Sequence, residues 1–392
     1  MINSEILLGL PDYQITGIEW KQGGVRLSAR YSGPIACPDC QSQRLRSKGR
    51  YQRQVRHENW GLRRCLLLLE LRKWQCRDCG RHFRQRLPGV QPRQRSSEAF
   101  QRHIFRQHLD GINRSRLAWR EGIGAATVER YFRRGLQRQF SARHSGRCPP
   151  VLGIDEHFFT RRQGYATTLC DLRHHKVYDV VLGRSEAALE TYFQRLEGKA
   201  DVRVVCMDLA SSYRALVRKH FPNARIVADR FHVIRLINHH FLACWRDLDP
   251  AGSRNRGLLS LMRRHRHKLS AEQQARLAAY LATQPALELI YRFKQRPCYL
   301  LLKRHRTRKQ CEQLVPRLLR AICQLRQAGL AQLVQLGETL HSWSTEIATM
   351  WRFTRNNGIT EGFHNKMELI NRQAFGFRNF QNYRLRVKVL CG

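Results

Sequence analysis

The order of strands and helices predicted between residues 149 and 235 is the strongest constraint on the fold. Three consecutive strand patterns, VLGID, YATTLCDL and KVYDVVLG, precede the amphipathic helix pattern SEAALETYFQRL. Two strand–helix pairs follow, VRVVCMD with SSYRALVRKHF and ARIVAD with FHVIRLINHHF. This order is typical of an α/β ribonuclease-H-like domain, in which an antiparallel meander of three strands is followed by strands joined through helical crossovers.

Aspartates end three of these strand patterns, although acidic residues are scarce, 30 against 71 Lys and Arg. Asp155 ends the first pattern, Asp208 the fourth and Asp229 the fifth. The first and fourth strands of this topology are neighbours, so Asp155 and Asp208 are expected side by side, where they repel unless cations lie between them. Two Mg²⁺ or Mn²⁺ ions suit such a site, because they bind carboxylates together with phosphate oxygens.

A third acid is expected on a helix late in the chain. In NNGITEGFHNKMELINRQAFGF, Asn356, Asn357 and Gly358 predict a helix-entry turn, and Thr360 to Gln373 a helix with Glu361 in its first turn. Any one of the three acids alone is better interpreted as a helix cap, a turn residue or a surface ion pair. Together, at the positions that this fold requires, they predict a catalytic, metal-binding set: Asp155, Asp208 and Glu361.

Two CxxC pairs predict a structural zinc site formed by Cys37, Cys40, Cys76 and Cys79. The chain between the pairs has the pattern of a β-hairpin, which would bring the pairs together. Four unrelated thiols, or a redox-active pair, are the alternatives. The doubled spacing and the absence of an apolar signal sequence favour zinc in a reducing compartment.

The segment SRLAWREGIGAATVERYFRRGLQR predicts a helix, a glycine turn and a second helix. A helix-turn-helix unit places its second helix in the major groove, where Thr127, Arg130, Arg133 and Arg134 are expected to contact DNA. A basic, solvated helical hairpin is the alternative interpretation.

The formal net charge of +41 indicates a polyanionic partner, and 42% hydrophobic residues allow a folded core that small ribosomal or chromatin proteins lack. Double-stranded DNA is therefore the expected partner. No apolar run is long enough to cross a membrane. We expect a cytoplasmic bacterial protein associated with the nucleoid.

The segments GIDEHFF, GYATTLCDLR, ADRFHVIRL and NNGITEGFHNKMELINRQAFGFRNFQNYRLRV resemble the ISL3 family of insertion-sequence transposases over nearly the whole chain. The resemblance implies a zinc-binding β domain, a helix-turn-helix and a DDE catalytic domain with a large helical insertion. It also gives Asp155, Asp208 and Glu361 the three triad positions. The expected divisions are 1–92 zinc-binding, 93–148 helix-turn-helix, 149–235 and 351–392 catalytic, and 236–350 insertion.

The expected reaction is metal-dependent cleavage at each end of the element, followed by attack of the freed 3′-hydroxyl on target DNA. The chain is expected to act as a homodimer or higher oligomer on DNA carrying the terminal inverted repeats. A structure-specific nuclease or resolvase, and a DNA-binding regulator without catalysis, are the competing hypotheses. Asp229 and His232 lie in the ADRFH block, and either a place near the metals or a packing role is open for them.

Overall fold

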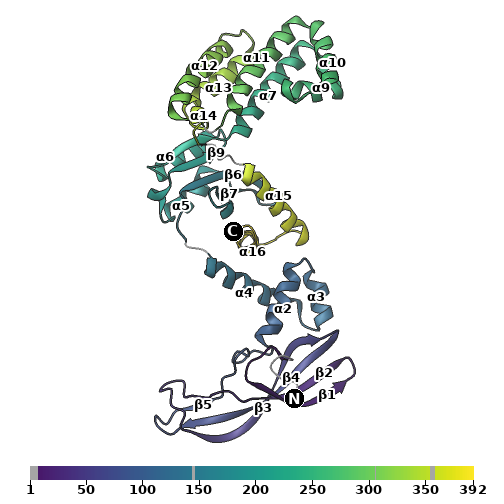
Figure 1. The fold of residues 1–392 in the computed structure, drawn as a ribbon, viewed down its shortest axis with the longest axis vertical. Coiled ribbons are helices and arrows are strands. Elements are labelled where there is room, and N and C mark those ends of the chain that lie inside the picture. The colour runs from purple at the N-terminus through teal and green to yellow at the C-terminus, as the bar shows by residue number, and fades with distance from the viewer. Residues whose placement is uncertain (1–7, 144–145, 305, 354–357) are drawn as a thin grey trace. The chain divides into compact units, whose positions relative to one another are not determined.

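The computed structural model describes residues 8–143, 146–304, 306–353 and 358–392. The chain divides into two compact units, Met1–Ala142 and Arg143–Gly392, which are described separately (Figure 1). The predicted Asn356–Asn357 turn lies outside the described residues. No helix in the described part of the chain is both long and apolar enough to cross a membrane.

The N-terminal unit begins with a twisted sheet in the order β1-β2-β4-β3, with β5 paired to β4. The predicted hairpin between the cysteine pairs is confirmed, because β3 and β4 pair antiparallel from Leu45↔Cys76 to Trp60↔Arg63. Alternate residues of β4, Leu67, Leu69 and Leu71, are buried in the core of this sheet. The strands are β1 Tyr13–Lys21, β2 Gly24–Tyr31, β3 Leu45–Trp60, β4 Arg63–Cys76 and β5 His82–Arg84.

Within the described residues, the sheet is followed by α2 (Glu98–Leu109), α3 (Arg114–Glu121) and α4 (Ala125–Arg143). Asn113 caps α3 by accepting a hydrogen bond from the Arg116 N–H at 2.8 Å. Gly122 ends α3 in the left-handed conformation at φ 65°, which favours glycine. The predicted helix, glycine turn and second helix are thus confirmed.

The second unit is built on a five-stranded sheet in the order β10-β9-β6-β7-β8. β6, β7 and β8 form an antiparallel meander, and β9 and β10 lie parallel to β6 on its other side. The predicted strand order, with the first and fourth strands adjacent, is confirmed. The strands are β6 Val151–Thr160, β7 Gly164–Asp171, β8 Lys176–Leu182, β9 Val204–Met207 and β10 Arg225–Ala228.

One strand boundary differs from the prediction. β6 continues past Asp155 to Thr160, because its pairing with β7 runs to Thr160↔Gly164. Its parallel pairing with β9 ends at Ile154↔Met207, immediately before Asp155 and Asp208. Asp155 is therefore inside a strand, at the level where the parallel part of the sheet ends.

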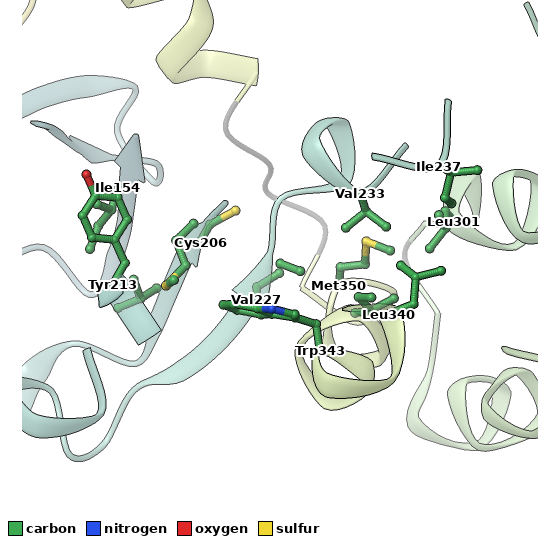
Figure 2. Close-up of a cluster of buried hydrophobic side chains, with 14 of the residues drawn as sticks. Ile154, Cys206, Tyr213, Val227, Val233, Ile237, Leu301, Leu340, Trp343 and Met350 are labelled. Atoms are coloured by element: carbon green, nitrogen blue, oxygen red, sulfur yellow. The ribbon is translucent and has the colours of Figure 1, made fainter. Parts of the chain in front are cut away.

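Helices α5 (Glu186–Gln194), α6 (Ser211–His220) and α7 (Arg230–Leu248) follow β8, β9 and β10. A helical insertion continues from α7, and a single hydrophobic core joins it to the sheet. Figure 2 shows Cys206 and Val227 on the sheet side and Leu340, Trp343 and Met350 on the insertion side of this core. The insertion comprises α8 Pro250–Arg254, α9 Arg256–Arg263, α10 Ala271–Ala282, α11 Pro285–Leu302, α12 Arg308–Arg326, α13 Ala331–Ser342 and α14 Ser344–Thr349.

The chain returns to the sheet through α15 (Gly358–Gln373) and α16 (Phe380–Leu390). A buried ion cluster fixes α16 to β8: Arg384 Nε and Lys388 Nζ donate to the Asp179 carboxylate at 2.7 and 3.0 Å. Burial opposes ionisation of Asp179, but the two cations keep its pKa below the ordinary value. The C-terminal helices are thus held on the sheet that carries the predicted acids.

Candidate active site and metal centre

Three aspartates meet at one edge of the five-stranded sheet of the second unit. In the register of the parallel strands, Ile154, Met207 and Ala228 are level, so the next residues, Asp155, Asp208 and Asp229, are neighbours. The Asp229 N–H also donates to the Met207 carbonyl at 2.7 Å. The structure thus brings Asp155 and Asp208 together as predicted and adds Asp229 to them.

Burial and mutual repulsion make ionisation of these carboxyls unfavourable. The pKa of Asp155 is raised to about 6, chiefly by burial, with Asp208 and Asp229 adding to the rise. The pKa of Asp208 is raised for the same main reason. Asp208 Oδ1 is buried without a hydrogen-bond partner among the described residues. Buried carboxylate oxygens usually have a partner, so this atom suits a bound cation.

His232 interacts directly with this group of acids. It lies in the first turn of α7, and its Nδ1 donates to Asp229 Oδ2 at 2.8 Å. This hydrogen bond raises the pKa of His232, and the charges of Asp155 and Asp208 act in the same direction. The pairing favours the protonated ring, which partly balances the carboxylates. The sequence left two roles open for Asp229 and His232, a place near the metals or packing. In the structure both residues lie beside the predicted acids.

Glu361 lies in the first turn of α15, and its side chain is exposed. Within the described residues it makes no hydrogen bond or ion pair to Asp155 or Asp208. Its helix is nevertheless fixed at this edge, since His364 Nε2 hydrogen bonds with Thr168 Oγ1 at 3.1 Å. Thr168 is the register partner of Asp155 on the adjacent strand β7.

A second histidine shares this contact. His157, two residues beyond Asp155, hydrogen bonds with Thr168 Oγ1 at 2.9 Å and, through Nε2, with the Tyr383 hydroxyl at 2.9 Å. Burial, together with His364, lowers the pKa of His157 to about 3, so its ring is neutral. Neither His157 nor His364 was expected from the sequence, because the contacts of His364 with Thr168 and of His157 with Tyr383 join segments that are far apart along the chain.

The four cysteines form a closed set in the N-terminal unit. Their sulfurs all lie within 4.8 Å of one another, with 3.5 Å between Cys37 and Cys79 and between Cys40 and Cys76. Sulfurs about 2.3 Å from one central Zn²⁺ lie about 3.8 Å apart, so the set fits zinc. Backbone N–H groups within each knuckle lower the pKa of Cys37, and lower that of Cys76 to about 7, which favours the thiolate at these two positions. Hydrogen bonds with neighbouring thiols and burial raise the pKa of Cys40 and Cys79.

The predicted DNA-contacting residues do not all face solvent. Arg130 and Arg133 are exposed on α4, and Arg130 Nη2 donates to Thr127 Oγ1 at 2.9 Å. Arg134 is half-buried and donates to Gln101 Oε1 on α2 at 3.3 Å. Thr127 is half-buried as well, so two of the four residues are exposed on α4 and two are partly covered.

Comparison with known proteins gives a consistent result for each part of the chain. The ISL3 model of DDE transposases, described as "Transposase", matches residues 152–387. Models described as "zinc-finger of transposase IS204/IS1001/IS1096/IS1165" and "Helix-turn-helix domain of transposase family ISL3" match residues 33–79 and 85–136. The transposase for insertion sequence element IS1001 of Bordetella parapertussis is 25% identical over 407 residues, covering 98% of this chain and 96% of that protein.

Proposed function

The chain belongs to the ISL3 family of DDE transposases, and from this premise we propose that Asp155, Asp208 and Glu361 are its catalytic, metal-binding acids. The observation that supports this most is the pairing of Asp155 with Asp208 at the end of adjacent parallel strands, with a buried Asp208 oxygen that lacks a partner. Both carboxyls occupy the edge at which ligand sites of α/β sheets form.

Two Mg²⁺ ions are the proposed cofactor of these acids, with Mn²⁺ as the substitute. When bound, such ions activate the attacking oxygen and stabilise the leaving oxygen of a phosphodiester. The carboxylates of Asp155 and Asp208 would hold them, and Glu361 would complete the set from α15. The cations would also relieve the burial and repulsion that raise the pKa values of the two aspartates.

The surrounding residues keep these acids in position. The Asp229–His232 hydrogen bond fixes the carboxylate beside Asp208 and supplies compensating positive charge. The contact between His364 and Thr168 fixes α15 next to Asp155. Glu361 lies in the first turn of this fixed helix. Fixed acids contribute to rate by holding DNA in the reactive geometry rather than by covalent chemistry.

DNA recognition is assigned to the N-terminal unit. We propose that Thr127, Arg130, Arg133 and Arg134 of α4 contact the terminal inverted repeats. The net charge of +41 favours binding of both transposon and target DNA. Each element has two ends, so a homodimer or higher oligomer on DNA is proposed for joint cleavage and strand transfer.

Glu361 is the decisive residue to test. Full-length chain is incubated with Mg²⁺ and duplex DNA carrying the element's own ends, and the products are mapped. Glu361→Gln should fold and bind DNA, yet cleavage should fall by several orders of magnitude as a metal ligand is lost. Glu368→Gln is the matched control, because Glu368 is exposed on the same helix and paired with Arg372.

The products also separate the competing functions. A transposase joins the 3′-hydroxyl of the cleaved end to target DNA, whereas a nuclease or resolvase of the same fold yields no such strand-transfer product. A dead Glu368→Gln with a normal Glu361→Gln would show that the wrong acid of α15 has been assigned.

A further inference from the structure

Two hairpin turns of the N-terminal sheet lie together at one end of it and carry exposed apolar side chains. Gly24 and Arg64, which follow the β1–β2 and β3–β4 turns, are register partners in the parallel β2–β4 pair. Leu62 at the apex of the second turn is fully exposed, and Trp119 at the end of α3 is 81% exposed. We call Trp20, Trp60, Leu62 and Trp119 the tip surface.

The tip surface is attached to the helix-turn-helix. Arg64 Nη2 donates to the carbonyls of Trp119 and Arg120 at 3.1 and 3.0 Å. A Cβ on Gly122, the first residue of the turn, would come within 2.5 Å of Arg64 Nη1. The hairpin turns are therefore fixed beside the turn that leads into α4.

A cavity of about 760 Å³ opens between the hairpin turns and α3. Gly23, Gly61, Leu62 and Trp119 contribute to its wall, and the polar side chains of Asn59, His103 and Gln107 also line it. Two carboxyls are present. Glu121 is fully buried and neutralised by Arg120 at 3.0 Å and Arg56 at 3.4 Å, and Glu58 is exposed.

Cations surround the apolar side chains. Trp20 and Trp60 stack at 5.7 Å, and the Arg63 guanidinium lies 4.9 Å from the Trp20 ring. Glu19 is paired with both Lys21 and Arg26. Apolar side chains set among arginines suit nucleic acid, because rings and aliphatic groups contact bases and sugars while the arginines contact phosphates.

We propose that the tip surface is a second DNA contact, which inserts Leu62 and Trp119 into the minor groove next to the major-groove site of α4. This inference rests on the proposed binding of element ends by the helix-turn-helix. A major-groove helix leaves the adjacent minor groove open to a neighbouring protein segment. Apolar side chains that enter a minor groove separate a base step and bend the duplex, which brings more DNA onto the protein.

A second copy of this chain would fit the tip surface less well than DNA does. Arg63, Arg64 and Lys21 interrupt the apolar side chains, whereas the centre of a stable protein interface is depleted of charge and continuously apolar. The continuity with the helix-turn-helix through Arg64 likewise favours the DNA that this motif binds.

The test uses the full-length zinc-loaded chain and a duplex from the end of the element that encodes it, with dyes at both ends of the duplex. Affinity and bending are compared for wild type, Leu62→Ser and Trp119→Ala. Both side chains are exposed, and the Trp119 carbonyl that Arg64 contacts is retained. Leu289→Ser is the control, because Leu289 is 71% exposed on α11.

Each tip variant should bind the end duplex about tenfold more weakly and bend it less, with an unchanged salt dependence since no phosphate contact is lost. Leu289→Ser should match wild type. Normal affinity and bending in both tip variants would overturn the inference, and so would a change confined to self-association in sedimentation. If the wild-type chain bound no end duplex, the proposed recognition of element ends would be overturned instead. Arg130→Ala tests that recognition separately.

Discussion

The two candidate metal centres are assembled in opposite ways. The four cysteines come from two turns at one end of a single β-hairpin, and their sulfurs already lie within 4.8 Å. The acids come from two neighbouring strands and from a helix that follows the whole insertion, and Glu361 makes no contact with the aspartates in the described residues. A structural site can thus be complete within one local motif, whereas the catalytic site depends on the entire second unit.

The electrostatics of the two centres differ in the same sense. Backbone N–H groups lower the pKa values of Cys37 and Cys76, whereas hydrogen bonds with neighbouring thiols and burial raise those of Cys40 and Cys79, so the thiolate form is favoured beforehand at two of the four ligands. Burial raises the pKa values of Asp155 and Asp208, so their metal-binding forms are disfavoured until charge is supplied. The comparison predicts that replacing a cysteine ligand destabilises the fold around the first centre. Replacing an aspartate at the second centre should instead relieve charge repulsion.

Cys76→Ser should have the largest effect. A structural zinc site contributes on the order of 10 kcal/mol to folding, so the N-terminal unit should lose its metal and unfold at lower temperature. Elemental analysis should fall from about one zinc per chain to almost none. Cys323→Ser, at an exposed position on α12, should leave zinc unchanged. Zinc retained by the Cys76 variant would refute the four-cysteine site.

Asp208→Asn should come next. Cleavage should fall by about 10⁴-fold, roughly 5 kcal/mol in the barrier, because a metal ligand is lost. Without metal, the variant should melt at an equal or higher temperature, since a buried carboxyl beside Asp155 and Asp229 has been neutralised. Asp201→Asn, an exposed position paired with Arg147, is the control. A marked loss of stability would show that Asp208 is structural.

Glu121→Gln should have the smallest effect, about 3 kcal/mol on the N-terminal unit, because the largely buried Arg56 loses its charged partner. Burial alone would raise the pKa of Glu121, but His103, Arg120 and Asn59 lower it to about 2. The contribution is therefore complete above the unfolded value of about 4.5 and is lost as pH falls toward 2.

The stability difference between wild type and this variant should shrink over that pH range, measured by urea unfolding. Acid release of zinc affects both proteins and cancels in the difference. Glu129→Gln on α4 should show no such pH dependence. A difference that stayed constant to the lowest pH would contradict the assignment.

Local pattern predicted much of this molecule. The doubled CxxC spacing, the glycine turn at Gly122 and the strand order all follow from nearby residues, and the structure has them. Contacts between distant segments could not be predicted. The pairing of His364 with Thr168 spans 196 residues, and the contact of Arg134 with Gln101 spans 33.

The strand boundary at Asp155 was missed for a related reason. An aspartate normally interrupts a strand pattern, but here β7 pairs with β6 on both sides of it. The tip surface was not anticipated either, because Trp20, Leu62 and Trp119 are far apart in sequence and only the sheet register and Arg64 bring them together. Exposure of apolar side chains is a property of the folded chain alone.

The continuous helix α7 has a mechanical consequence. Its first turn carries His232 beside the acids, and its 19 residues extend about 28 Å to Leu248, with Trp245 buried near that end. Trp245 Nε1 donates to the Tyr280 hydroxyl on α10, so each end of α7 is held by a side-chain hydrogen bond. α7 is therefore a stiff rod with one end at the chemistry. One uninterrupted helix therefore links the outer helices of the insertion to His232.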